Sequence, residues 1–132
     1  ISCGFMLKKQ LISCRIREEK MNLYFYESKS GKNVILEYIN SLSVDEQVDG
    51  YSVLKCLEEE KMDSVRFKRW EKKVYEVYFY KHNRIFYVAA DGNNMYLLHA
   101  CRKQKNKTEK KDKKIVEIRA KELGKQLGKL FI

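Results

Sequence analysis

The feature that most constrains the fold is a series of four strand-like runs joined by very short connections in residues 65–101. Each run is rich in β-branched and aromatic residues, which favour pleated strands. The runs are VRFKRW (65–70), VYEVYFY (74–80), RIFYVAA (84–90) and MYLLHAC (95–101). Only EKK, KHN and DGNN separate them, and connections of that length can join only antiparallel neighbours. The sequence therefore predicts an antiparallel meander of four strands.

Two helices in tandem are predicted before the meander. A first strand, NLYFYES after Met21, precedes them and can add to the edge of the sheet. Ser30 can cap the first helix, and residues 43–46 form a capping box that opens the second. Apolar residues recur every three or four positions in both helices, which predicts one buried face on each. These residues are Val34, Ile35, Tyr38, Ile39 and Leu42 in the first helix, and Val44, Val48, Tyr51, Leu54 and Leu57 in the second.

A last helix is predicted after the meander, with Thr108 as its cap. One side of this helix is lined by Val116, Ala120, Leu123, Leu127 and Leu130. The predicted fold class is thus α+β. In it, an N-terminal strand and a helical hairpin pack on an antiparallel sheet of four to five strands, and a C-terminal helix follows. A chain of 132 residues suffices for one such domain.

Residues 1–20 are predicted to be a leader or a non-native extension, and residues 21–132 to be the domain itself. Residues 17–20, REEK, directly precede Met21. All four can be encoded by purine-only codons, as a bacterial ribosome-binding site before a start codon would be. The alternative is a genuine short N-terminal helix. The sequence has no secretory cleavage pattern and no apolar run near the roughly 18 residues of a membrane span, so we expect a cytoplasmic protein with no membrane partner.

The formal charge of +10 is spread unevenly along the chain. Carboxylates outnumber cations in residues 21–60, whereas residues 61–132 are strongly basic. Residues 101–114 alone hold eight cationic side chains and two carboxylates. Basic residues interleaved with aromatic ones favour nucleic acid as the partner, and we expect Arg102, Lys105 and Lys107 to bind phosphate.

Metal and cofactor chemistry finds no support in the sequence. The four cysteines, at positions 3, 14, 56 and 101, form no CxxC pair and have no histidine at metal-ligand spacing, so we expect them to be reduced. Walker, GxSxG and HExxH motifs are absent, as is a carboxylate cluster suited to magnesium. The sequence therefore predicts neither a metal nor a cofactor.

A candidate site follows from the predicted pairing of the strands. If KHN closes a tight hairpin, Tyr80 pairs with Arg84. If DGNN closes the next one, Arg84 faces Cys101, Phe86 faces His99 and Ala90 faces Met95. Because alternate residues share a face, one side of the sheet then holds a cluster of cations, aromatics and one imidazole. Its members are Arg66, Lys68, Tyr78, Tyr80, Arg84, His99 and Lys103, with Phe86, Val88 and Leu97 on the same face, so only the end near Arg84 is expected to be polar and open.

Such a surface suits RNA, because cations neutralise phosphate and aromatic rings stack on splayed bases. Metal-free cleavage requires a base for the 2′-hydroxyl, and His99 or a lysine among like charges is the candidate. It also requires stabilisation of the charged phosphate, which the planar guanidinium of Arg84 can supply. Plainer alternatives are a semi-buried structural His99 and an exposed Arg84 after a turn. For Glu76, an ion pair with Arg84 or Lys68 is favoured over a role as the base.

Several phrases in this order resemble the RelE/ParE toxin superfamily, specifically its phage-derived HigB-like branch of type II toxin–antitoxin toxins. The resemblance covers about residues 21–120. Its pieces are FYESKSGKNVILEYINSL, FKRWEKKVYEV, NRIFYV and LLHACRKQKNKT. The resemblance implies a RelE-like fold and a ribosome-dependent endoribonuclease that cuts translated mRNA. It also implies an antitoxin partner, expected to be a helix-turn-helix protein encoded beside it.

The resemblance also implies roles for individual residues. Arg84 would stabilise the phosphate, and Lys103 would bind RNA or assist proton transfer. Lys68 and Arg69 match a basic pair, Tyr87 matches an aromatic of the family motif, and Tyr78 stands where an arginine is usual. The candidate catalytic residues are Arg84, Lys103, His99 and Lys68, and the candidate RNA-binding residues are Arg66, Arg69, Tyr78, Tyr80, Tyr87, Arg102, Lys105 and Lys107.

Two other functions stay open from the sequence. A ParE-like gyrase poison shares the architecture without nuclease chemistry, and would cause DNA strand breaks while mRNA stays intact. A non-catalytic basic nucleic-acid-binding phage protein is the second. Replacing Arg84 or Lys103 in that protein would only weaken binding in a salt-dependent way.

Overall fold

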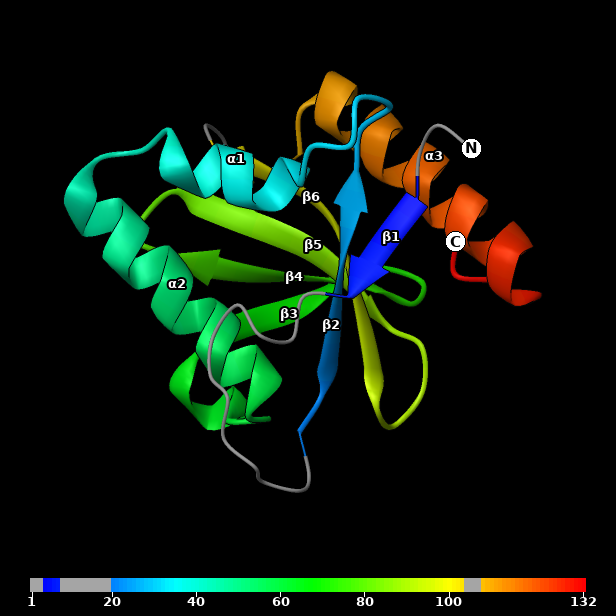
Figure 1. Ribbon diagram of the computed structural model, residues 1–132, viewed down its shortest axis with the longest axis horizontal. Helices are drawn as coiled ribbons and strands as arrows, with labels where there is room; N and C mark the ends of the chain where they lie inside the picture. Colours follow the sequence, from blue (N-terminus) through cyan, green and yellow to red (C-terminus); the bar gives the residue numbers. More distant parts are fainter. Residues whose placement is uncertain (1–3, 8–19, 104–107) are drawn as a thin grey trace.

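The computed structural model describes residues 4–7, 20–103 and 108–132, and its elements form a layered α+β fold (Figure 1). Helices α1 and α2 lie on one side of a sheet and α3 lies on the other. The elements are β1 (Gly4–Leu7), β2 (Asn22–Glu27), α1 (Val34–Asn40), α2 (Val44–Glu58), the 3-10 helix η2 (Met62–Ser64), β3 (Arg66–Glu71), β4 (Val74–Phe79), β5 (Asn83–Ala89), β6 (Asn94–Arg102) and α3 (Lys110–Leu127). The predicted fold class is confirmed.

The sheet has the strand order β1-β2-β6-β5-β4-β3 and contains the predicted meander. Strands β3, β4, β5 and β6 pair antiparallel in succession. The sheet as a whole is mixed, because β2 pairs with β6 in parallel. Short turns fix the direction of the meander strands, whereas the two helices between β2 and β3 leave the direction of β2 free. Strand β1 pairs antiparallel with β2, and the assignment of residues 1–20 as a leader stays a prediction.

Both faces of the sheet are apolar over most of their area. On the α1 and α2 side, Ile35, Ile39 and Leu54 are fully buried against side chains of the sheet. On the α3 side, Val116, Ala120 and Leu123 are fully buried, as predicted. Among the described residues, no helix combines the length and apolar character that crossing a bilayer requires.

The helix starts agree only in part with the predicted caps. The capping box at residues 43–46 is present at the start of α2. Helix α1 is capped by Asn33 rather than Ser30, since the Asn33 side chain accepts hydrogen bonds from the backbone N–H groups of Ile35 and Leu36. At α3 the cap position is Glu109, because the hydroxyl of Thr108 is engaged elsewhere.

The predicted buried face of α2 is wrong at its first two positions. Val44 and Val48 are 73% and 66% exposed. The helix instead approaches the sheet through Gly50, where an added Cβ would lie 3.0 Å from the ring of Phe79. A glycine at that position lets the helix pack closely, and this contact rotates the two valines into solvent.

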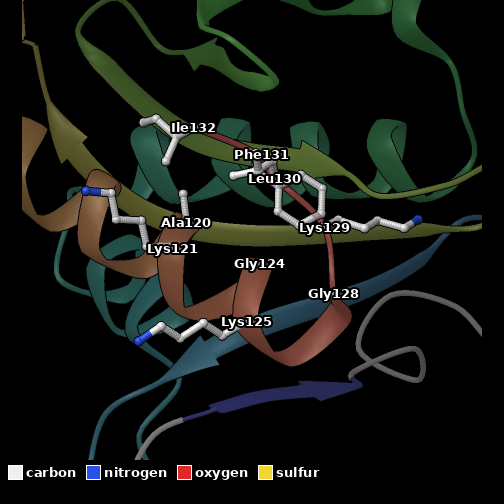
Figure 2. Close-up of a pocket in the computed structure, with 9 residues that line it drawn as sticks. All are labelled: Ala120, Lys121, Gly124, Lys125, Gly128, Lys129, Leu130, Phe131 and Ile132. Carbon is white, nitrogen blue, oxygen red and sulfur yellow. The ribbon is translucent and has the colours of Figure 1, made fainter.

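The C-terminal tail turns back along α3, which the sequence did not indicate. Gly128 adopts the left-handed conformation with φ 69°, and the Lys129 N–H then donates to the Gly124 carbonyl at 3.0 Å. Phe131 is buried by this turn, whereas Leu127 and Leu130, predicted to be core, are 36% and 79% exposed. Figure 2 shows the tail beside α3, where the two border a pocket of about 480 Å³.

Two hairpin registers decide which residues share a face. The β4–β5 turn comprises residues 80–82, so Tyr78 rather than Tyr80 pairs with Arg84. This register differs from the predicted one by two residues, and the predicted faces are therefore retained.

In the β5–β6 hairpin, Arg84 faces Cys101 and Phe86 faces His99, as predicted. A bulge then changes the register, and Ala89 rather than Ala90 pairs with Met95. Leu97 consequently lies in the core on the α2 side, not on the predicted face.

Candidate nucleic-acid interface

Two rows of side chains cross the α3 side of the meander. Cross-strand pairing from β3 to β6 aligns Lys68, Glu76, Phe86 and His99 in the first row. The second row is formed by Arg66, Tyr78, Arg84 and Cys101. The pairing therefore brings predicted site residues from all four strands to one face.

Arg84 is buried in the middle of the second row, with only 3% of its surface exposed. Its Nη1 donates to Glu76 Oε1 at 2.6 Å and to Thr108 Oγ1 at 3.1 Å. The expected ion pair with Glu76 is thus confirmed. The expectation of an open end around Arg84 is wrong, because Thr108, just before α3, covers the guanidinium, and Trp70 donates to the same hydroxyl at 2.9 Å.

Two further cations, Arg66 and Lys103, lie against the ring of Tyr78. The guanidinium carbon of Arg66 lies 5.1 Å from the ring centroid, and the ammonium of Lys103 lies 5.0 Å from it. Both cations are therefore held over the electron-rich ring. Lys103 reaches the same side of the sheet as Arg84, as the sequence analysis predicted.

The Tyr78 hydroxyl is kept in its neutral, proton-bearing form. Burial raises its pKa, and the nearby carboxylate of Glu76 raises it further, while Lys68 acts in the opposite direction. A phenol with a raised pKa donates hydrogen bonds at neutral pH and does not act as a base. We call Tyr78 and five residues near it the Tyr78 cluster, whose members are Arg66, Lys68, Glu76, Tyr78, Arg84 and Lys103.

The Tyr78 cluster is strongly cationic, with four cations and one carboxylate. Arg66 and Lys68 are exposed, and Tyr78 and Lys103 are partly exposed, whereas Arg84 and Glu76 form a buried layer beneath them. The exposed cations can bind a polyanion directly. The buried pair can only fix the positions of its neighbours in this arrangement.

His99 lies at the far end of the first row from Lys68. Three strand spacings of about 4.8 Å separate its strand from that of Lys68, and the Phe86 ring lies between. Its Nε2 is 2.8 Å from Asp112 Oδ1. Burial lowers the pKa of His99, an effect larger than the opposing one of Asp112. The structure does not bring His99 together with Lys68 and Lys103, whereas Arg84 is near enough to add to the lowering of the His99 pKa.

Three candidate RNA-binding residues lie on the opposite side of the sheet. Arg69 and Tyr87 border a cleft of about 1050 Å³ between η2, the sheet and the C-terminal tail. Tyr87 is only 3% exposed and stacks on Tyr75 with 5.9 Å between centroids. Arg102 donates to Glu46 of α2 at 3.1 Å. Neighbouring strand residues point to opposite faces, which separates Arg69 from Lys68.

The remaining candidates lie in turns or outside the described residues. Tyr80 lies in the β4–β5 turn, has a positive φ of 39°, and donates its backbone N–H to Asp49 Oδ2 at 2.5 Å. Lys105 and Lys107 lie outside the described residues.

Sequence reasoning missed Thr108, Trp70 and Asp112 as partners of the candidate residues. The sequence predicted Thr108 to cap a helix and Trp70 to lie in a strand, and neither prediction suggested that the two side chains contact each other. Asp112 is one of only two carboxylates among the cations of residues 101–114. A carboxylate within so basic a segment was the one available signal that Asp112 has a specific, buried role.

Residues 37–121 match the family of phage-derived Gp49-like proteins (DUF891). This region covers more than half of the chain. The chain belongs to the Gp49-like family. The Gp49-like region runs from α1 into α3 and contains every residue of the Tyr78 cluster. No curated protein matches the chain.

Proposed function

We propose that this Gp49-like protein is the toxin of a type II toxin–antitoxin system, and that it cleaves mRNA on the ribosome without a metal. The Gp49-like family is toxin-like, which supports the first part. The observation that carries the second part is the Tyr78 cluster, where exposed cations surround a neutral phenol above a buried ion pair.

The proposed reaction needs only groups of this kind. A base takes the proton of the 2′-hydroxyl, and the 2′-oxygen forms a bond to phosphorus while the bond from phosphorus to the 5′-oxygen breaks. The products are a 2′,3′-cyclic phosphate and a 5′-hydroxyl, which receives a proton. Negative charge grows on the phosphate oxygens during this step, and preorganised cations lower its barrier.

Roles within the Tyr78 cluster follow from exposure. Arg66 and Lys103 are accessible and are proposed to bind the phosphates. Lys68 is proposed as the base, because it is exposed and adjoins the Tyr78 hydroxyl. Arg84 is proposed to position Glu76 and Tyr78, and it contacts the phosphate only if Thr108 moves aside.

The proposed partners are an adjacently encoded antitoxin and mRNA on the ribosome, which places the protein in the cytoplasm. An antitoxin with an acidic segment is complementary to the exposed cations of the Tyr78 cluster. Covering these cations would block the proposed RNA interface directly.

The test is induced expression of the full chain in bacteria, with and without the neighbouring reading frame, while growth and mRNA 5′ ends are followed. We expect arrest and new 5′ ends with the full chain alone. Lys68→Ala should lower cleavage by roughly 100-fold or more, as expected for loss of a general base, with only a small, salt-dependent loss of RNA binding. Lys125→Ala is the matched control, because it removes an exposed lysine from α3 outside the Tyr78 cluster.

Three outcomes would contradict the proposal. Arrest with intact mRNA and broken DNA would indicate a gyrase poison. Unaffected growth would indicate a nucleic-acid-binding protein without nuclease chemistry. Cleavage and binding that decline together in Lys68→Ala would show that Lys68 binds RNA and is not the base.

A further inference from the structure

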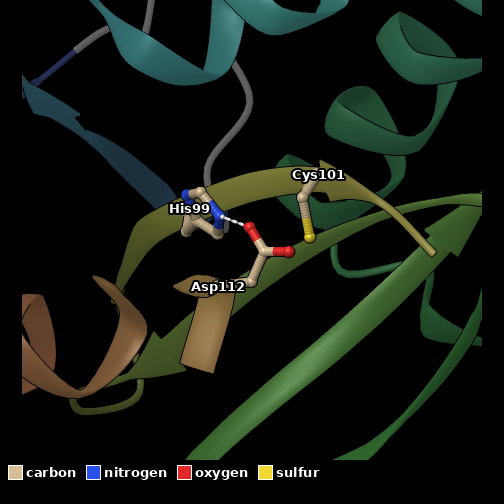
Figure 3. Close-up of side chains that lie close together, drawn as sticks. All are labelled: His99, Cys101 and Asp112. Carbon is tan, nitrogen blue, oxygen red and sulfur yellow. Dashed lines mark hydrogen bonds and ion pairs between the residues drawn. The ribbon is translucent and has the colours of Figure 1, made fainter. Parts of the chain in front are cut away.

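A second group of reactive side chains lies on the α3 face where β6 meets the start of α3, and one of its members, Cys101, is the cross-strand partner of Arg84. His99, Cys101 and Asp112 place their donor atoms within 4.8 Å of one another (Figure 3). His99 Nε2 and Asp112 Oδ1 are the closest measured pair, at 2.8 Å. The proposed RNA cleavage uses none of these three residues.

Local structure brings the three residues together. His99 and Cys101 are alternate residues of β6 and share the face toward α3, while Asp112 lies in the first turn of α3. All three are largely buried: the side chains of His99 and Asp112 are 13% and 10% exposed, and Cys101 is 8% exposed. β6 and α3 therefore bring three potential metal-binding atoms together at one largely buried position.

The donor set suits zinc. Zinc binds imidazole nitrogen, thiolate sulfur and carboxylate oxygen at about 2.0–2.3 Å, commonly with three protein ligands and one water. Those bond lengths correspond to donor separations of roughly 3.3–3.8 Å in a tetrahedral site. A set within 4.8 Å reaches this geometry through side-chain adjustments of about 1 Å or slightly more.

Charge and access are also compatible with zinc. A thiolate and a carboxylate together cancel the charge of a divalent ion, which avoids a net charge in a buried place near Arg84 and Arg119. The proton of the Cys101 thiol leaves to solvent when the metal–sulfur bond forms. A pocket of about 320 Å³ borders all three residues, and it provides an entry route and space for a water ligand.

We propose that His99, Cys101 and Asp112 bind one zinc ion, which joins the end of β6 to the start of α3. The ion is structural, because it holds two elements together and none of its three ligands belongs to the Tyr78 cluster. Its site does not rest on the proposed nuclease function, and either can be wrong alone.

The test uses the full chain, freed of metal, with Co²⁺ as the spectroscopic probe and Zn²⁺ as the competitor. We expect one equivalent of Co²⁺ to give tetrahedral visible bands and a thiolate charge-transfer band, and Zn²⁺ to displace both. Cys101→Ser should remove the charge-transfer band. It should also weaken binding by more than about 100-fold, because loss of a ligand exceeds the 10–100-fold cost of an outer-shell change.

The matched control is the Cys3→Ser/Cys14→Ser/Cys56→Ser variant, which keeps Cys101 as its only cysteine. It should bind Co²⁺ like the parent chain. His99→Gln and Asp112→Asn should each weaken binding, and circular dichroism checks that they stay folded. Three results would overturn the site: no binding at roughly 100 μM metal, a charge-transfer band that survives Cys101→Ser, or a band lost in the triple variant. For the parent chain, a melting temperature that rises with Zn²⁺ concentration gives an independent readout.

Discussion

The buried ion pair between Arg84 and Glu76 permits a direct test of the structure. The two side chains are only 4% and 3% exposed, and their Nη1 and Oε1 atoms are 2.6 Å apart. Glu76→Leu would leave the guanidinium buried with Thr108 as its remaining hydrogen-bond partner among the described residues. Arg84→Met would leave the carboxylate buried in the same way. Each single change therefore leaves one charge buried in a low-dielectric environment without its partner.

The expected cost of either single change is about 3–5 kcal/mol of unfolding free energy, as found when one partner of a buried pair is removed. For a domain of this size, that corresponds to a fall of roughly 10–25 °C in the melting temperature. The double variant Arg84→Met/Glu76→Leu removes both charges and fills a similar volume. It should be more stable than either single variant, and close to the parent chain in stability.

Urea unfolding followed by tryptophan fluorescence measures these differences, since Trp70 is the only tryptophan and packs edge-on against Phe86 at 5.2 Å. The control is Lys113→Met, which breaks an exposed pair with Glu71 at 3.6 Å and should cost less than about 1 kcal/mol. If Glu76→Leu costs no more than this control, or if the two single effects simply add, Arg84 is not buried against Glu76 and the described arrangement is wrong.

Three further predictions concern the end of α3, the start of α2 and the cover over Arg84. Gly124→Ala should destabilise the chain by about 1–3 kcal/mol, although alanine has a better helix propensity than glycine. The reason is that the new Cβ would lie 2.5 Å from the Lys129 carbonyl oxygen. Urea unfolding measures the change in stability. Hydrogen bonds from Asn83 and Ser43 lower the pKa of Glu46 from 4.5 to about 2, so its stabilising contribution is complete above pH 4.5 and is lost as the pH falls toward 2. Thermal unfolding between pH 2 and 6 should show this loss in the parent chain and a smaller loss in Glu46→Gln. Thr108→Val removes the shared acceptor of Trp70 and Arg84 and should cost about 1–3 kcal/mol, with greater acrylamide quenching of Trp70; unchanged quenching would contradict the cover over Arg84.

The sequence predicted the meander and the sharing of faces because both depend on local rules. Short connections determine antiparallel pairing, and a two-residue error in the β4–β5 register left Arg84 and Tyr78 on the predicted side. The bulge in β6 has no such local signal, since its position depends on how two β strands and α3 pack together. Leu97 was therefore assigned to the wrong face.

The environment of Arg84 was not predictable for a related reason. Its position on the α3 face follows from alternation along β5, whereas its burial depends on Thr108, 24 residues later in the chain. Nothing in the pattern around Thr108 indicates a tertiary contact, because the same residue type also fits a helix cap. The contact between Asp112 and His99 was missed in the same way, since it joins a helix and a strand across an undescribed segment.

Phe86 lies between the two sites proposed on the α3 face in the row of Lys68, Glu76 and His99. Its ring packs against Trp70 and His99 and lies 5.3 Å from the Arg84 guanidinium carbon. Phe86 therefore stands between Glu76 and His99, whereas Cys101 directly faces Arg84. Arg84 and His99, which both lie beside Phe86, each have their own carboxylate partner, Glu76 and Asp112 respectively. The two sites nevertheless share the start of α3, because Thr108 covers Arg84 and Asp112 contacts His99 only four residues later. An ion that fixes Asp112 would therefore also hold the cover over Arg84 in place.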